Sequence, residues 1–426
     1  MPRCLARVRL PRWCLAADWP QQGAQPALAD VNIGQGRITA ITPSGAIPPG
    51  AWNLDGAPVL PGLVDAHTHL DKAFTLRRMS AVKPGLLGAI EAMMADRQGW
   101  TADDVHERAS KALAWAYDAG VVHVRTHVDW WEPQATPLAW GVLNSLAGEW
   151  AGRITLERVS LSPLTMYAGR EAARALAKQV SGSGAGARLG GFVHTVNWDA
   201  QALRHLFEAA QQFDLDVDLH CDEELNPAAL GLASTARLLG EIGYGGRVVC
   251  GHVCALAAQP AAQALATLDA VARAPITLIT LPITNLLLQD AQTARTPRLR
   301  GITLVKEARA RGIPLLIASD NVQDPFCPVG SFDPVEALAA GVLAAQLDQP
   351  FDVWSESLCR ADWLQRKPGP SPLRVGDCAD LVIFDRSDVH GWPSRGQSRV
   401  VLRGGTVVAG RVPAAVSFFQ DQGQAP

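Results

Sequence analysis

The sequence predicts an α/β protein: a parallel (β/α)8 barrel with a small β-sandwich domain built from both chain ends. Eight apolar, strand-like runs alternate with helical stretches rich in Ala, Leu and Arg. Short apolar runs broken by glycine and proline lie near both ends of the chain. Reactive side chains follow many of the eight runs, and the carboxyl ends of barrel strands are where such enzymes keep their chemistry.

Composition narrows the possible partners. The 426 residues are 48% hydrophobic and 19% charged, with a formal net charge of −3. A near-neutral chain without a long Lys/Arg run argues against nucleic acid or an anionic membrane as partner, and no apolar window reaches the length of a membrane span. The eight cysteines are scattered, without CxxC pairs. We expect a cytoplasmic protein with reduced thiols that acts on a small molecule, and a homo-oligomer.

The two ends of the chain share one pattern. From Val31 to about Pro61, short apolar alternations are broken by glycines and prolines, as expected of several short strands. The segment from Leu373 to Val412 repeats this pattern. We therefore expect residues 1–60 and 368–426 to form the small β-sandwich domain, and residues 61–367 to form the catalytic barrel.

The barrel strands are expected in order along the middle of the chain. Their runs are Leu63 to His69, Gly120 to Thr126, Ile154 to Leu161, Gly190 to His194, Leu215 to His220, Arg247 to Gly251, Ile276 to Leu281 and Ile313 to Ala318. The single low-complexity piece, Ser181 to Ala187, is expected as a flexible turn before the fourth strand.

The first barrel run ends in a pair of histidines. His67 and His69 are two residues apart, and residues at that spacing on a strand point to the same face. Both imidazoles can therefore bind one metal ion.

Three later runs end in further reactive residues. His220 ends the fifth run and Glu223 follows three residues later, which offers a metal ligand and an acid/base. His252 ends the sixth run and is suited to hydrogen-bond a metal-bound hydroxide. Asp320 ends the eighth, where a carboxylate can bind the metal or accept a proton from bound water.

Each of these residues alone could be an ordinary polar group or a helix cap. Four of them at strand ends, with the first two at HxH spacing, predict a metal site made by His67, His69, His220 and Asp320. A divalent metal with an open position lowers the pKa of bound water, so the expected chemistry is hydrolytic.

Other residues near the expected pocket have open roles. His127, Asp129 and His194 follow or end barrel runs, and structural and substrate-contacting roles are equally compatible with their positions. Three loop tryptophans either pack in the core or wall a ring-shaped substrate: Trp130, Trp131 and Trp198.

Longer motifs carry a resemblance. VLPGLVDAHTHLDKAF, RTHVD, DLHCDE and SDNVQDPF resemble the amidohydrolase superfamily, and most of all its cytosine deaminase group. The resemblance spans nearly the whole chain. It implies a mononuclear, metal-dependent hydrolytic deaminase of an amino-substituted N-heterocycle. The four predicted ligands would hold one iron or zinc ion.

The resemblance also implies catalytic roles. Glu223 would carry a proton from the attacking water to a ring nitrogen, while His252 and the ligand Asp320 would act on that water. Binuclear members of the superfamily resemble one another in using a carboxylated lysine after strand four. Here the only lysine between Lys111 and Lys306 is Lys178, inside a helical run, so one metal ion is expected.

The chain departs from cytosine deaminases where the substrate is recognised. Those enzymes carry a glutamine after strand three, and the matching stretch here is Leu161-Ser162-Pro163-Leu164. Asn321 stands where they tend to have a second Asp, and Phe326 where an aromatic residue covers the ring. We expect Ser162, Asn321 and Phe326 to contact the substrate and cytosine to be a poor one, because its ring amide would lack partners.

Several functions remain as alternatives. Relatives of this branch act on pterins and aminotriazines, and either fits the sequence. A cyclic amide hydrolase shares the expected fold, but the missing strand-four lysine and the HCDE motif argue against it. A non-catalytic binding protein would have no need of six reactive residues.

Overall fold

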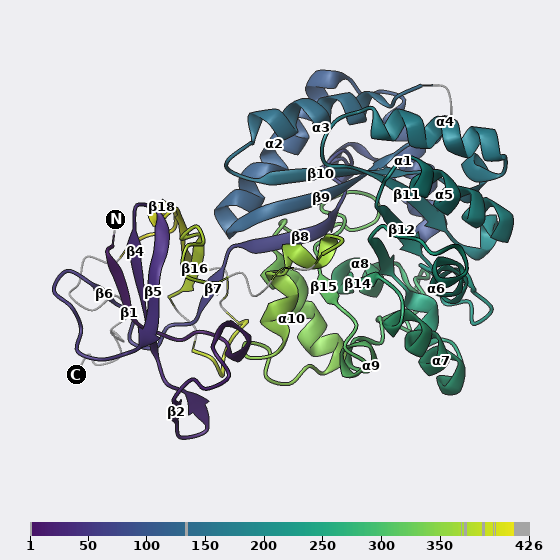
Figure 1. Ribbon diagram of the computed structural model, residues 1–426. Helices are drawn as coiled ribbons and strands as arrows, with labels where there is room; N and C mark the ends of the chain where they lie inside the picture. The colour runs from purple at the N-terminus through teal and green to yellow at the C-terminus, as the bar shows by residue number, and fades with distance from the viewer. Residues whose placement is uncertain are drawn as a thin grey trace.

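The computed structural model describes residues 2–132, 135–367, 369, 373–385, 388–394, 396 and 398–412. A barrel ringed by helices forms the larger part of the molecule, and the strands from the two ends of the chain form a smaller β-unit beside it (Figure 1).

The barrel strands form one parallel sheet in sequence order, from β8 to β15. They are β8 (Leu63–Thr68), β9 (Val121–Asp129), β10 (Thr155–Leu161), β11 (Ala187–Val193), β12 (Val217–Cys221), β13 (Val248–His252), β14 (Ile276–Thr280) and β15 (Leu315–Ile317). The ring closes where the backbone N–H of Asp320 donates to the carbonyl of His67 at 2.9 Å. All eight predicted runs contain a strand, which confirms the barrel.

Helices cover the outside of this sheet (Figure 1). They are α1 (Leu86–Arg97), α2 (Ala102–Ala119), α3 (Leu138–Glu149), α4 (Arg170–Ser181), α5 (Ala200–Gln212), α6 (Gly231–Ile242), α7 (Ala261–Ala272), α8 (Pro282–Leu288), α9 (Val305–Ala310) and α10 (Pro334–Ala345). Short 3-10 helices are η1 (Arg12–Cys14), η2 (Leu76–Arg78), η3 (Leu164–Tyr167), η4 (Thr195–Asn197), η5 (Cys254–Ala257), η6 (Trp354–Leu358) and η7 (Ala361–Leu364).

The ends of α2 illustrate how the sequence fixes these helices. The Thr101 side chain accepts from the backbone N–H of Asp104, which satisfies a free donor of the first turn. Gly120 ends the helix at φ 102°, a conformation that favours glycine. A Cβ at Gly120 would also lie 2.4 Å from Val382 of the smaller β-unit. The glycine therefore lets the barrel and the β-unit approach closely.

The smaller β-unit contains two four-stranded sheets, with strand orders β5-β4-β1-β6 and β18-β17-β16-β7. Its strands are β1 (Cys4–Val8), β4 (Ala29–Gly34), β5 (Arg37–Pro43), β6 (Trp52–Asn53), β7 (Val59–Pro61), β16 (Leu381–Phe384), β17 (Arg399–Arg403) and β18 (Thr406–Ala409), beside a hairpin of β2 (Gln21–Gln22) and β3 (Gln25–Pro26). Antiparallel pairing of β7 with β16 joins the two chain ends, and one apolar core contains Leu5, Val31, Leu381 and Val400.

This arrangement confirms the prediction of a β-unit made from both ends. The sequence reasoning placed its first strand after Val31 and missed β1, because arginines interrupt the apolar alternation there. Part of the predicted segment 368–426 lies outside the described residues. No helix in the described part of the chain combines the length and the apolar character needed to cross a bilayer.

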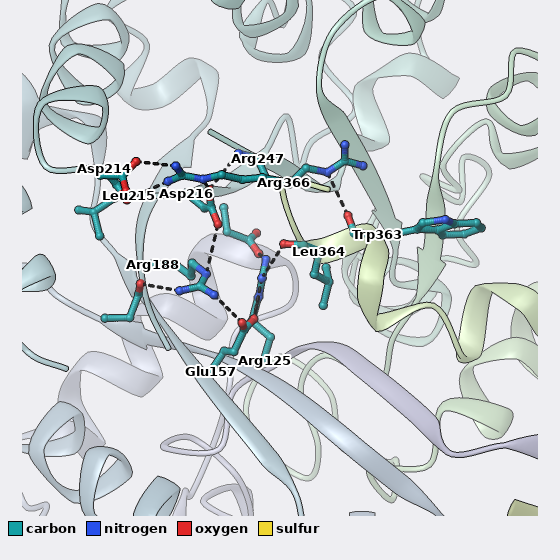
Figure 2. Close-up of polar contacts among 12 residues, drawn as sticks. Arg125, Glu157, Arg188, Asp214, Leu215, Asp216, Arg247, Trp363, Leu364 and Arg366 are labelled. Carbon is teal, nitrogen blue, oxygen red and sulfur yellow. Dashed lines mark hydrogen bonds and ion pairs between the residues drawn. The ribbon is translucent and has the colours of Figure 1, made fainter. Parts of the chain in front are cut away.

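Charged residues fill the amino-terminal half of the barrel. Figure 2 shows Arg125 of β9 between strands and the η7 segment: it contacts Glu157 at 2.6 Å and Asp218 at 2.8 Å, and donates to the carbonyl of Leu364 at 3.4 Å. Arg247 donates to the neighbouring carbonyl of Trp363 at 3.0 Å. These charged groups pair with one another, so this end of the barrel is filled by ion pairs. The reactive side chains predicted from the sequence lie at the opposite, carboxyl end.

Candidate active site

Three imidazoles meet at the carboxyl end of the barrel. His67 lies on β8, His69 directly follows it and His220 lies on β12. The Nε2 atom of His220 is 3.1 Å from the Nε2 atoms of both His67 and His69. Imidazole nitrogens bind zinc at about 2.0–2.1 Å, so nitrogens that share one ion lie roughly 3 Å apart. The observed spacing suits three ligands of one metal ion.

Asp320 adds a carboxylate to the same cluster. Its Oδ1 atom is 3.3 Å from Nε2 of His69 and 3.6 Å from Nε2 of His67. The backbone of Asp320 has a φ of 63°, which is uncommon for a residue other than glycine and marks the sharp turn after β15. Burial, together with the neighbouring imidazoles, lowers the pKa of His67 and His220 well below the ordinary value. The imidazoles are therefore neutral, the form that binds metal.

His252 lies close enough to His67 and His220 to be a further possible metal ligand, and Glu223 lies beside His252. Oε1 of Glu223 is 3.4 Å from Nδ1 of His252, and that nitrogen is 3.1 Å from Oδ1 of Asn285. Burial and then the charge of Asp320 raise the pKa of Glu223 well above its ordinary value, so the carboxyl holds a proton readily. Burial lowers the pKa of His252, which keeps it neutral. The pair can store and move protons next to a metal site.

These groups open onto a cavity at the carboxyl end of the barrel. Its polar lining includes His69, Lys72, Asp129, His220, Glu223 and Asn321. Four apolar side chains of α1 form one wall: Leu86, Ile90, Met93 and Met94. Aromatic rings of Trp131, Phe192 and Phe326 complete the lining with Leu161. A cavity with apolar walls and a few polar groups suits a flat, ring-shaped ligand.

The residues predicted to contact the substrate divide. Asn321 and Phe326 line the cavity. Ser162 is fully buried and is not among the described lining residues. Of the loop tryptophans, Trp131 lines the cavity, whereas Trp130 packs edge-on against Trp140, with ring centroids 5.2 Å apart, and Trp198 packs against the core.

His127, Asp129 and His194, whose roles the sequence left open, take three different positions. The ring of His127 lies 3.9 Å from that of His67, centroid to centroid, and its Nε2 atom is 3.7 Å from Oδ1 of Asp218. His127 thus supports a predicted ligand from behind. Asp129 lines the cavity. The side chain of His194 accepts from the backbone N–H of Val196 and caps η4.

One charged residue that lines the cavity was not predicted from the sequence. Lys72 is three residues beyond His69, and its ammonium lies 3.0 Å from Oδ1 of Asp129. The sequence did contain a signal for this residue. In HTHLDK the lysine is only three residues from two predicted metal ligands, so it is expected close to a buried site and not on the surface.

Comparison with known proteins is consistent with this geometry. The chain matches the profile of the amidohydrolase family over residues 51–196 and 193–412. It is 37% identical to a pterin deaminase of Rhizobium rhizogenes (strain K84 / ATCC BAA-868) over 391 residues, which cover 90% of this chain and 89% of the relative. It is 24% identical to an N-isopropylammelide isopropyl amidohydrolase of Pseudomonas sp. (strain ADP), over 77% of this chain and 79% of the relative.

A solved structure shares the fold. A 5-methylcytosine deaminase from Klebsiella pneumoniae, liganded with 5-fluorocytosine, aligns with a TM-score of 0.78 at 23% identity. The alignment covers 97% of this chain and 99% of that chain. The likeness therefore extends over the smaller β-unit as well as the barrel.

Proposed function

Because the chain belongs to the amidohydrolase family, we propose that it is a metal-dependent hydrolytic deaminase of an amino-substituted N-heterocycle. One observation carries the proposal: three neutral imidazoles and a carboxylate converge at one end of a cavity, and a separate buried glutamate lies beside them. A site of this kind supplies both an activated water and a proton carrier.

We propose that His67, His69, His220 and Asp320 hold one iron or zinc ion. When bound, such an ion lowers the pKa of a coordinated water and so supplies hydroxide near neutral pH. The neutral state of the imidazoles and the short distances among the four side chains support this set.

Glu223 and His252 would move the protons. Glu223 takes a proton from the attacking water and passes it to the ring nitrogen next to the amine-bearing carbon, so that oxygen adds to that carbon without a full negative charge on the ring. His252, whose Nδ1 atom faces Asn285, orients the water. A further proton transfer to the amine lets it leave as ammonia, and the ring keeps a carbonyl oxygen in its place.

A pterin is the leading substrate. The relative with 37% identity over most of both chains is a pterin deaminase. The apolar wall of α1 and the aromatic rings of Trp131, Phe192 and Phe326 suit a flat bicyclic ring. An aminotriazine is the alternative, since the relative with 24% identity acts on N-isopropylammelide. A cyclic amide hydrolase is the second alternative from the same superfamily.

Ammonia release from a substrate panel tests the proposal. The panel contains pterin, cytosine, an N-alkylated aminotriazine and, as the cyclic amide, dihydroorotate. We expect release of ammonia from pterin or release of an amine from the triazine, and no ring opening of dihydroorotate. Ring opening without any deamination would contradict the proposal.

A further inference from the structure

The cavity contains a cation that the proposed proton transfers do not use. We propose that Lys72 and Asn321 together recognise a ring lactam that lies across the amine-bearing carbon from the ring nitrogen protonated by Glu223. Pterin carries its ring N–H and carbonyl in that position, whereas the ring amide of cytosine lies on the same side as the protonated nitrogen. This inference rests on the proposed function and names the substrate class of the same site.

Local geometry directs Lys72 into the cavity. Its backbone N–H donates to the carbonyl of His69 at 3.1 Å, so the lysine sits one turn beyond a predicted metal ligand. The residue is only 4% exposed, and its Nζ atom lies 5.0 Å from the centre of the Phe326 ring. An ammonium in this position lies beside the ring that would cover the substrate.

The charge of Lys72 is maintained by its neighbours. Burial alone would lower the pKa of Lys72, but the carboxylates of Asp129 and Asp71 outweigh burial and raise it. An ammonium has three donors and no acceptor capacity. Among the described residues, Asp129 is the one carboxylate within 4.0 Å of Nζ. Donors therefore remain for an acceptor on a bound ligand.

Asn321 supplies the complementary acceptor. Its Nδ2 atom donates to Oδ2 of the fully buried Asp324 at 2.6 Å. The other carboxylate oxygen of Asp324 accepts from the backbone N–H groups of Phe326 at 2.9 Å and Cys327 at 3.1 Å, so Asp324 is held on both sides. Because the amide nitrogen is engaged, Oδ1 of Asn321 is left as an acceptor for a ring N–H.

A lactam matches this pair better than other oxygen-bearing groups. Its carbonyl accepts from Lys72 and its adjacent N–H donates to Asn321. An exocyclic carboxylate would also attract the ammonium, but it would repel the Asn321 carbonyl and the Asp129 carboxylate. The residue that lines the cavity after strand three is Leu161, which offers no side-chain hydrogen bond. The lactam is therefore recognised on the Phe326 side of the cavity, and not on the strand-three side where cytosine deaminases carry their glutamine.

Matched substrates test the inference in the metal-loaded enzyme. Pterin is compared with 2-aminopteridine, which lacks the ring carbonyl, and with pterin-6-carboxylate, which adds a carboxylate. We expect kcat/KM for pterin to exceed that for 2-aminopteridine by about ten- to a hundredfold, mostly through KM, the scale of one hydrogen bond to a charged group. Lys72→Met should reduce this ratio to less than about threefold.

The control replaces an exposed lysine outside the cavity. Lys111 also lies over aromatic rings, with Nζ 4.0 Å from the centre of Phe74, yet it does not line the cavity. Lys111→Met should leave the substrate ratio unchanged. If Lys72→Met does not fold, the double variant Lys72→Met/Asp129→Asn removes both charges together and is measured in its place.

Separate outcomes address the two proposals. Equal losses on pterin and 2-aminopteridine in Lys72→Met would assign Lys72 a structural role and overturn the inference. A loss confined to pterin-6-carboxylate would assign it to a carboxylate and also overturn it. If no heterocycle releases ammonia, the proposed function fails. Titration with lumazine, the deaminated lactam, followed by fluorescence, then tests the inference alone. We expect Lys72→Met to weaken lumazine binding by at least about tenfold, the scale of a lost hydrogen bond to a charged group, and unchanged binding would overturn the inference.

Discussion

Glu223 and Glu224 are consecutive buried carboxylates with different partners. Glu223 lies in the cavity beside His252, whereas Glu224 accepts from the backbone N–H of Thr195 at 2.7 Å. The contrast separates the proposed proton carrier, Glu223, from a structural residue that has the same carboxyl group.

We predict that Glu223→Gln keeps the metal and lowers turnover by at least about a hundredfold, the scale expected for one positioned acid/base. Glutamine has the size of glutamate but cannot carry the proton. Glu224→Gln is the control and should retain most of the activity. Metal content and turnover are measured on the same samples. Loss of metal with retained turnover in Glu223→Gln would show that the assigned roles are wrong.

Cytosine should be a poor substrate for reasons that also lie at single residues. Ser162 and Pro163 stand where cytosine deaminases carry a glutamine, and Asn321 stands where they tend to carry an aspartate. Next to Ser162, Leu161 lines the cavity and offers no side-chain hydrogen bond. Loss of a pair of hydrogen bonds to a buried ring amide should cost roughly 2–4 kcal/mol in transition-state binding, or about thirty- to a thousandfold in specificity. Steady-state kinetics decide the point. A kcat/KM on cytosine above about 10⁶ M⁻¹s⁻¹ would contradict the prediction.

At the scale of elements, the ends of the barrel strands were predictable and the covering wall was not. The HxH motif at the end of β8 and the HCDE motif at the end of β12 place metal-binding residue types at the carboxyl ends of strands, which made the site predictable. The structure brings His67, His69, His220 and Asp320 together. The α1 helix is different. Its apolar residues are compatible with ordinary core packing, and only the tertiary arrangement shows that they face the cavity.

Lys72 and β1 escaped prediction for related reasons. Lysines are usually predicted to be exposed, because an unpaired ammonium is costly to bury. Lys72 is paired with Asp129, which is distant in the sequence, so the sequence does not reveal the pair. Arg7 interrupts the apolar pattern of β1, and the strand is defined by its pairing with β4.

The loop after β15 provides a pH-dependent prediction. Burial raises the pKa of Asp324 to about 7, above the ordinary value of a carboxyl group. The folded state therefore binds this proton more tightly than the unfolded state does. Stability from this group is greatest below about pH 4 and falls as the pH rises toward 7, by at most about 1.4 kcal/mol per pH unit.

Asp324→Asn cannot ionise and should remove this part of the pH dependence. We expect the melting temperature of the variant, relative to that of the unchanged protein, to increase between pH 5 and pH 7.5. Asp118→Asn, at an exposed position of α2, is the control and should follow the unchanged protein. Parallel curves for Asp324→Asn and the unchanged protein would contradict the prediction.

At the scale of the whole molecule, the predicted ligands come from widely separated parts of the chain. His67 lies on the first barrel strand, β8, and His69 directly follows it. His220 lies on β12, and Asp320 lies just after the last strand, β15. The backbone contact of Asp320 with His67 closes the ring between the first and last strands. A metal ion bound by these side chains would tie that closure together, so metal binding and barrel stability should be coupled.

Chelation should therefore lower the melting temperature of the whole protein. An ion present at a hundred times its dissociation constant adds about 2.7 kcal/mol to stability, which corresponds to roughly 3–4 °C in melting temperature for a chain of this size. His220→Ala should lose most of the metal and show little further change on chelation. His205→Ala removes another buried histidine, which contacts the carbonyl of Tyr167 on the outside of the barrel, and should keep its metal. Elemental analysis measures the metal content, and calorimetry measures the melting temperature. Full metal retention after replacing both His67 and His69 would refute the site. An ion held elsewhere could not tie β8 to the segment after β15.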